Sequence, residues 1–240
     1  MKTDKFIFTH TDCTCPEGWE VIDNRNSVLD HRMWSEIAGL KTVYDRYMQI
    51  EEEKKKDVKG EKLAPFPPDF VCTAHYRRIM DPNCSNRTYV AQPMVLQTTL
   101  AQQYAACHFI EDLQLMGKAI KECYPSIVQF AEQVLNGNIF IPYNIVNCQY
   151  KQFLDWVNFV ITILNKVDEY LGHPNFDQMK EIISKRKQPM IEGRNNDISY
   201  QSRLYSFGSE RLSTIYWLAI SRQIPVFPAE VKLLEEGQKI

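Results

Sequence analysis

Apolar residues occur in short runs at several places along the chain and at helical spacing elsewhere. The run Lys5–His10 predicts a first strand, because it is short, contains β-branched and aromatic residues, and ends at polar turn residues. Phe70–Thr73 predicts a short buried strand, and Thr88–Ala91 and Asn138–Tyr143 predict two more. Turn-forming residues lie between these runs, which therefore indicate a sheet of short strands.

Longer segments carry apolar residues at intervals of three and four, the spacing of one helix face. They predict a helix from Leu29 and helices over Leu100–Cys123, Ile127–Val134, Phe153–Leu171, Phe176–Lys185 and Ser209–Ser221. The tail after Ile224 is instead expected to begin with a strand-like segment. Ser209 is expected to be the N-cap of the last helix, because a serine hydroxyl accepts a hydrogen bond from the first turn.

This order of short strands and longer helices predicts an α/β fold that is an open sheet with many helices and a helix-rich C-terminal half. The chain has 240 residues, of which 44% are hydrophobic, and we expect a single domain over residues 1–240. Residues 48–68 interrupt the pattern, with the charged run Glu51–Lys56 followed by three prolines. We expect a mobile arm and connection there.

Charge and cysteine content exclude several classes of protein. The formal net charge of -2 argues against a general nucleic-acid binder, which carries a basic excess. No apolar run is long enough to span a bilayer, and Phe6–Phe8 is too short for a signal-peptide core. The seven cysteines are scattered and odd in number, which favours reduced thiols. We therefore expect a cytoplasmic protein, with any membrane association peripheral and at the inner face.

The most informative polar run is His75-Tyr76-Arg77-Arg78, directly after the strand predicted at Phe70–Thr73. Strand ends of open α/β sheets are common ligand sites, and guanidinium groups bind phosphate or carboxylate with fixed geometry. The alternative is a solvated loop whose charges pair with nearby acids. Because neighbours on an extended segment point to opposite faces, one of the two arginines could instead anchor the fold.

Three other clusters could carry chemistry. Asp23–Asn26 precedes a helix that contains Glu36, a pattern that an ordinary turn and helix would also give. His108 lies close to Glu111 and Asp112 at helical spacing, and a His with two carboxylates can bind a metal or act in acid–base catalysis. The alternative is a helix with solvated acids. Arg211 follows the expected cap at Ser209, and the capping role does not explain it.

In chain order, these clusters resemble the bacterial capsular and exopolysaccharide glycosyltransferase family catalogued as domain of unknown function 4422. Its members are similar to glycosyltransferases of the GT-A type. The matching segments are Phe6–His10, Asp23–Asn26, Trp34–Leu40, Cys72–Met80, Tyr104–Leu113, Asn138–Phe140 and Phe207–Leu212. The chain departs from the family at Arg25, where the family has Ile, and at Gly39–Lys41, where an aromatic-rich run is usual.

The resemblance implies transfer of a sugar from a nucleotide-sugar donor, in the first instance a UDP-sugar, to a glycan or lipid-linked acceptor in capsule, exopolysaccharide or O-antigen synthesis. It implies a catalytic base at Asp112 or else Glu111, oriented by His108. The donor and diphosphate residues would be His75, Tyr76, Arg77, Arg78, Arg211, Asn24 and Glu36. Further site candidates from the matched motifs are His10, Asn138 and Glu210.

The sequence leaves the metal, the partners and catalysis itself open. No Asp-x-Asp pair is present, so either His108, Glu111 and Asp112 hold a divalent ion or none is needed. One alternative is a catalytically decayed protein that binds a nucleotide sugar or glycan on the same scaffold. Another is an interaction protein that binds no nucleotide. The oligomeric state does not follow from the sequence.

Overall fold

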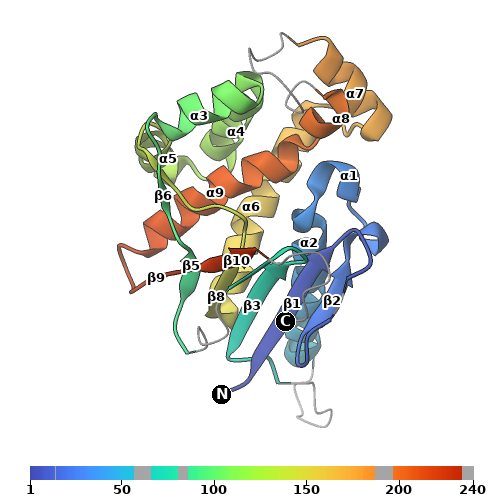
Figure 1. The fold of residues 1–240 in the computed structure, drawn as a ribbon, viewed down its shortest axis with the longest axis vertical. Coiled ribbons are helices and arrows are strands. Elements are labelled where there is room, and N and C mark those ends of the chain that lie inside the picture. The colour runs from blue at the N-terminus through green and yellow to red at the C-terminus, as the bar shows by residue number, and fades with distance from the viewer. Residues whose placement is uncertain (14, 57–65, 81–85, 187–196, 234–240) are drawn as a thin grey trace.

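An open sheet forms one half of the molecule, and helices cover one face of it and form the other half (Figure 1). The computed structural model describes the chain except residues 14, 57–65, 81–85, 187–196 and 234–240. The strands are β1 (Thr3–Thr9), β2 (Glu20–Asp23), β3 (Phe70–His75), β4 (Arg78–Met80), β5 (Tyr89–Ala91), β6 (Met94–Val95), β7 (Ile139–Phe140), β8 (Val146–Gln149), β9 (Phe227–Ala229) and β10 (Val231–Leu233). The α/β prediction of short strands and many helices is confirmed.

The helices concentrate in the second half of the chain, as predicted. They are α1 (His31–Trp34), α2 (Glu36–Lys56), α3 (Leu100–Cys107), α4 (Ile110–Cys123), α5 (Val128–Leu135), α6 (Tyr150–Tyr170), α7 (Phe176–Ser184), α8 (Ile198–Gln201) and α9 (Leu204–Ile220), with 3-10 turns η1 (Asn24–Asn26) and η2 (Pro125–Ile127). Within the described ranges, no helix is both long and apolar enough to cross a membrane.

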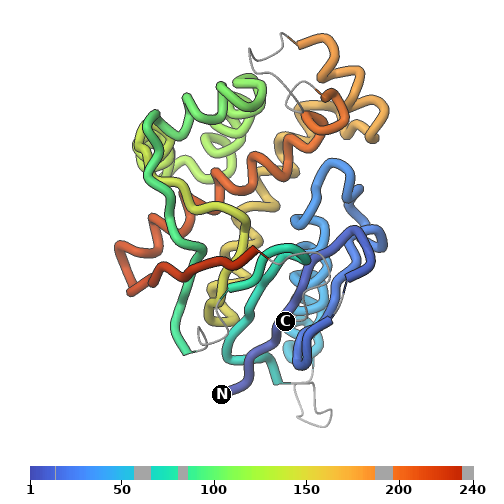
Figure 2. The backbone as a smooth tube through the Cα atoms, viewed as in Figure 1, coloured from blue at the N-terminus to red at the C-terminus, as the bar shows by residue number. Residues whose placement is uncertain are grey.

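The sheet brings three strand ends together at one edge. Strand β1 runs parallel to both β2 and β3, and Phe8 lies opposite His75. Strands β4 and β8 pair with β3 in the antiparallel sense. The C-terminal segment returns across the sheet, where β9 pairs with β5 and β10 with β4 (Figure 2). The carboxyl ends of the parallel strands therefore meet at the edge that faces the helical half.

Helix α9 crosses the middle of the molecule, between the sheet and the cluster of α3, α4 and α5 (Figure 1). It packs against α6, α1 and α4, and its Trp217 lies 5.6 Å from Trp156 of α6, centroid to centroid. The rings of Trp34 and Tyr205 stack at 4.1 Å. Because partners surround α9, several of its polar side chains are also buried, among them Ser209, Arg211 and Ser213.

Two helix predictions were wrong at the functionally important positions. The helix expected over Leu100–Cys123 is broken, since α3 ends at Cys107 and α4 begins at Ile110. His108 is the C-cap of α3, so it does not share a helix face with the acids that follow. Ser209 is not an N-cap either: α9 begins at Leu204, and Ser209 lies fully buried inside it, donating to Ser206 O at 2.6 Å.

Other boundaries also differ from the prediction. The helix expected from Leu29 is divided at Ser35, whose φ of 48° ends α1 before α2 begins. Strands β2 and β8 were not predicted, because their apolar runs are short and lie beside polar residues. Of the arm expected at residues 48–68, residues 48–56 continue α2, and residues 57–65 lie outside the described parts of the chain.

Gly39 allows α2 to approach the sheet closely. A Cβ atom at this position would lie 2.4 Å from Phe8 Cδ1 and 2.4 Å from Asn24 Oδ1, and both neighbours are buried. A side chain would therefore force the helix or the sheet to move. This close contact gives a physical reason for glycine at position 39.

We expect Gly39→Ala to lower the free energy of unfolding by about 1–3 kcal/mol, because overpacking exceeds the gain of about 1 kcal/mol in helix propensity. Gly117→Ala in α4 is the matched control, since nothing lies within 4 Å of its new Cβ. It should raise the free energy of unfolding by up to about 1 kcal/mol. Urea denaturation measures both, and a stabilised Gly39→Ala protein would contradict this close helix–sheet contact.

Candidate functional site

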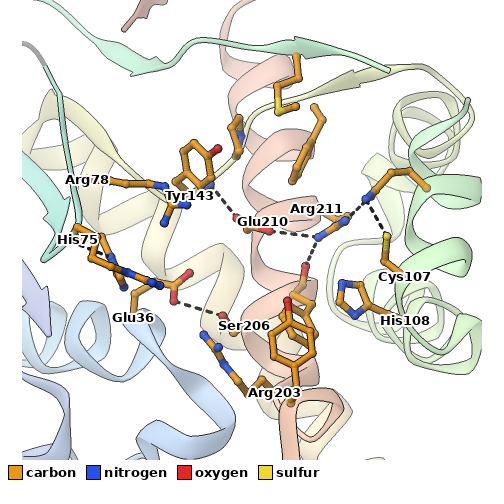
Figure 3. Close-up of a pocket in the computed structure, with 17 residues that line it drawn as sticks. Glu36, His75, Arg78, Cys107, His108, Tyr143, Arg203, Ser206, Glu210 and Arg211 are labelled. Carbon is orange, nitrogen blue, oxygen red and sulfur yellow. Dashed lines mark hydrogen bonds and ion pairs between the residues drawn. The ribbon is translucent and has the colours of Figure 1, made fainter. Parts of the chain in front are cut away.

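A pocket of about 340 Å³ lies at the carboxyl edge of β3, between the β3–β4 hairpin, the end of α3 and the middle of α9 (Figure 3). Positive side chains dominate it, together with two carboxylates and several rings. The basic residues are His75, Arg77, Arg78, His108, Arg203 and Arg211. The acids are Glu36 and Glu210, and the rings are Phe140, Tyr143, Tyr200 and Phe207.

The β3–β4 hairpin brings both neighbouring arginines to the pocket. Strand β3 ends at His75, residues Tyr76 and Arg77 form a turn, and β4 begins at Arg78. Because the turn interrupts the alternation of an extended strand, Arg77 and Arg78 both line the cavity. The Arg78 guanidinium lies 4.4 Å from the centroid of the Tyr143 ring.

His75 is a neutral hydrogen-bonding group at the base of this hairpin. Burial, followed by the charges of Arg77 and Arg78, lowers the pKa of His75 to about 3. Its Nδ1 accepts the backbone N–H of Arg77 at 3.3 Å, which leaves the proton on Nε2. The neutral ring is thus a donor beside the arginines, and it adds no charge of its own.

Helix α9 and its N-cap supply one face of the pocket. The N-cap Arg203 is followed at intervals of four residues by Phe207 and Arg211. The Arg203 side chain is held by Ser35, whose Oγ accepts from its Nε at 3.0 Å. Arg211 is almost completely buried and donates to Phe207 O, Gln103 Oε1 and Glu210 Oε2. Arg211 is therefore occupied by the protein itself.

Arg77, Arg78 and Arg203 differ from Arg211 because they lack a paired carboxylate among the described residues. Among the residues that the structure describes, none of these three forms an ion pair with a carboxylate. The surface arginines Arg25 and Arg32, by contrast, pair with aspartates. The pocket thus presents positive charge that its own acids do not neutralise, as a site for an anion requires.

The two carboxylates have different surroundings. Glu36 accepts hydrogen bonds only from neutral groups, Asn144 Nδ2 at 3.0 Å and Ser206 Oγ at 3.2 Å. Burial, and next the charge of Glu210, raise the pKa of Glu36. Glu210 accepts the backbone N–H of Tyr143 at 2.8 Å and pairs with Arg211 at 3.2 Å. Among the described residues, Glu36 thus lacks a paired cation, whereas Glu210 has one.

His108 lies on the opposite wall, stacked on Phe207 with 3.9 Å between ring centroids. Its Nδ1 lies 3.1 Å from Gln201 Oε1, and Gln201 Nε2 donates to Cys107 O at 2.9 Å. This arrangement places the imidazole proton on Nδ1 and leaves Nε2 as an acceptor. Burial, then the charge of Arg211, lower the pKa of His108 to about 3, so the ring is neutral.

The predicted catalytic acids lie outside the pocket. Asp112 is 1% exposed and is bonded to Arg186, and burial raises its pKa to about 6. Glu111 is exposed in the first turn of α4. Within the described parts of the chain, no three His, Cys, Asp or Glu side chains converge as metal ligands, so His108, Glu111 and Asp112 do not form the cluster that the sequence left open.

The pocket contains seven of the residues that the sequence singled out: Glu36, His75, Arg77, Arg78, His108, Glu210 and Arg211. Four others lie elsewhere. Tyr76 packs edge-to-face on His10, with ring centroids 5.2 Å apart. Asn24 is buried beneath Gly39, and Asn138 donates to Leu96 O at 3.3 Å.

Sequence analysis missed Arg203, Ser206, Tyr143 and Asn144. Arg203 and Ser206 precede the expected helix start, so they were not placed on the helix face that carries Arg211. A start at Leu204 would have shown their spacing from Phe207 and Arg211. Tyr143 and Asn144 reach the site through a turn with φ values of 76° and 53°, and no motif in the sequence predicts it.

Residues 33–221 match the family described as domain of unknown function (DUF4422), and the chain belongs to this family. The fold is shared with the apo structure of WbbM, a bifunctional glycosyltransferase, at a TM-score of 0.68 and 11% sequence identity. That match covers 98% of this chain and 46% of WbbM, so the chain spans just under half of that protein. No curated protein matches the chain. The predicted family and fold class are confirmed.

The burial of Asp112 predicts a pH-dependent effect on stability. A carboxyl whose pKa rises on folding stabilises the fold fully below its ordinary pKa near 4, and this contribution is lost as pH rises through about 6. The stability of the native protein relative to Asp112→Asn should therefore fall by roughly 2–3 kcal/mol between pH 4 and pH 7. Urea denaturation across this range measures it.

The neighbouring substitution Glu111→Gln is the control, because Glu111 is exposed in the same helical turn. The difference in free energy of unfolding between Glu111→Gln and the native protein should not change across the same pH range. A difference for Asp112→Asn that is likewise independent of pH would contradict the burial of an ionisable Asp112.

Proposed function

We propose that the protein is a glycosyltransferase that moves a sugar from a nucleotide-sugar donor to a glycan or lipid-linked acceptor. The observation that carries this proposal is the charge of the pocket. Arg77, Arg78 and Arg203 have no acidic partner among the described residues, yet they line one cavity with Glu36. The shared fold with a glycosyltransferase supports the same reaction class.

The arginines provide what the leaving group needs. When the sugar is transferred, the nucleoside diphosphate gains negative charge, and preformed positive groups stabilise that charge in the transition state. Arg77 and Arg78 approach from the hairpin and Arg203 from α9, so a diphosphate between them would be bound from two sides. Neutral His75 adds a hydrogen-bond donor on the hairpin side.

Glu36 is the group best suited to take the proton of the acceptor hydroxyl. A general base works best when its pKa lies near the working pH, and burial raises the pKa of Glu36 from its ordinary value. Glu210 is held in an ion pair with Arg211. This assignment replaces the one at Asp112, whose carboxyl is bonded to Arg186 outside the pocket.

The first test is calorimetry with UDP and other nucleoside diphosphates. Loss of one charge-assisted hydrogen bond costs about 1.5–3 kcal/mol, so Arg77→Ala, Arg78→Ala and Arg203→Ala should each weaken binding roughly 10- to 100-fold. Arg32→Ala is the control, because that arginine is exposed and paired with Asp30. Unchanged affinity in all three pocket variants would remove the diphosphate role.

The second test separates binding from turnover in Glu36→Gln. We expect sugar transfer from UDP-sugars to fall about 10²- to 10⁴-fold while UDP binding persists, because the amide cannot accept the proton. In the native protein, kcat/KM should decline as pH falls through the raised pKa of Glu36. Measuring transfer with and without a chelator determines whether a divalent ion contributes.

Asp112→Asn is the matched control in this assay, and it should retain transfer. Transfer that survives in Glu36→Gln but is lost in Asp112→Asn would assign the base to Asp112. Donor binding without turnover in the native protein, with every donor and acceptor tried, would instead support a decayed binding protein.

A further inference from the structure

A buried chain of hydrogen bonds connects the protein core to Glu36. Trp156 Nε1 donates to Ser213 Oγ at 3.0 Å, and Ser213 Oγ donates to Asn144 Oδ1 at 2.6 Å. Asn144 Nδ2 then donates to Glu36 Oε1 at 3.0 Å and to Ser209 Oγ at 2.8 Å. Trp156, Ser213, Asn144 and Ser209 are each no more than 4% exposed.

The direction of every bond in this chain is determined. Ser209 donates its single hydrogen to a carbonyl, Ser206 O, at 2.6 Å, so its Oγ must accept from Asn144 Nδ2. This constraint orients the Asn144 amide with Nδ2 toward Glu36 and Oδ1 toward Ser213. Because Oδ1 can only accept, Ser213 Oγ donates its hydrogen to it and accepts from Trp156 Nε1, which can only donate.

The backbone of Asn144 is held as firmly as its side chain. Its φ of 53° lies in the left-handed region, which asparagine adopts more readily than most residues. Its carbonyl accepts from Thr73 Oγ1 of β3 at 3.1 Å. The preceding residue, Tyr143, has a φ of 76°, and its N–H binds Glu210. This two-residue turn therefore contacts both carboxylates of the pocket, and strained backbone of this kind concentrates at functional sites.

We propose that Asn144 is a positioning residue that fixes the carboxylate of Glu36, oriented for this task by Ser209 and Ser213. The proposal rests on the proposed role of Glu36 as base. Asn144 Nδ2 donates to Oε1 and cannot become an acceptor, so protonation of Glu36 is favoured at Oε2. Ser206 Oγ lies 3.2 Å from Oε2, and its hydroxyl can reverse from donor to acceptor when that oxygen is protonated.

The proton of the acceptor hydroxyl would therefore pass to Oε2 as the hydroxyl oxygen bonds to the sugar carbon and the nucleoside diphosphate leaves with the electrons of its bond. Other groups that act on Glu36 are Glu210 and Arg203 of α9, and His75, Arg77 and Arg78 on the hairpin wall of the pocket. Variants at Asn144 or Ser213 leave all of these groups in place.

The test is a pH titration of the Glu36 carboxyl carbon by NMR in free protein labelled with ¹³C-glutamate, with its signal identified by its loss in Glu36→Gln. Asn144→Gly removes the donor and tolerates the positive φ. We expect it to raise the pKa of Glu36 by about one unit, the value of one hydrogen bond to a charged group. Ser213→Ala, which does not touch Glu36, should raise it in the same direction by less.

Ser202→Ala is the control, because Ser202 is also fully buried and, among the residues that the structure describes, its hydroxyl bonds only to Ile198 O. Its Glu36 titration should match that of the native protein. If Asn144→Gly fails to fold, Ser213→Ala decides alone, since a merely structural serine would not move the titration. An unchanged Glu36 titration in the folded variants would overturn the proposal.

The titration also separates this proposal from the proposed function, because it needs no substrate. Shifted titrations in a protein that transfers no sugar would refute the function and keep the positioning role of Asn144. Sugar transfer that depends on Glu36, together with unshifted Glu36 titrations, would keep the proposed function and refute the positioning role of Asn144. In an active protein, Asn144→Gly should also move the acidic limb of the kcat/KM profile upward by the same amount.

Discussion

The burial of helix α9 is the constraint on which the rest of this structure depends. The helix crosses the middle of the molecule, with helices of the sheet side on one flank and α3–α5 on the other, so even its polar side chains have little access to water (Figure 1). Buried polar groups must find hydrogen-bond partners, and Ser209, Ser213 and Arg211 bond to three other parts of the chain: α3, α6 and the turn at Asn144. The hydrogen bonds of α9 thus connect the core of the protein to the pocket.

The same constraint gives the pocket its two kinds of charge. Arg211 and Glu210 bond to each other and to other groups inside the protein, which stabilises this wall of the pocket. Arg203 on α9 and the hairpin arginines are left for an external anion, while Glu36 is surrounded by neutral donors that leave it basic. One site therefore combines positive charge that is unpaired among the described residues with a carboxylate, and these are the two features that the proposed sugar transfer requires.

The sequence predicted the fold class and much of the pocket, because local patterns carry that information. The run from His75 to Arg78 follows a buried strand, and strand ends meet at one sheet edge. Asp112 lies outside the pocket because a two-residue break, His108 and Phe109, separates α3 from α4, which periodicity alone does not reveal. Arg203 and Asn144 were missed because tertiary packing, not local pattern, brings them to the site. Asn144 lies in a left-handed turn, and Arg203 is the N-cap of a helix whose expected cap was Ser209.

The most direct test of the central claim is a crystal structure of the protein with UDP or another nucleoside diphosphate bound. The account predicts phosphate oxygens within hydrogen-bonding distance of the guanidinium groups of Arg77, Arg78 and Arg203, with the Glu36 carboxylate facing the side from which an acceptor would approach. A diphosphate bound away from these arginines, or a pocket that stays empty at saturating concentrations of every nucleoside diphosphate, would contradict it.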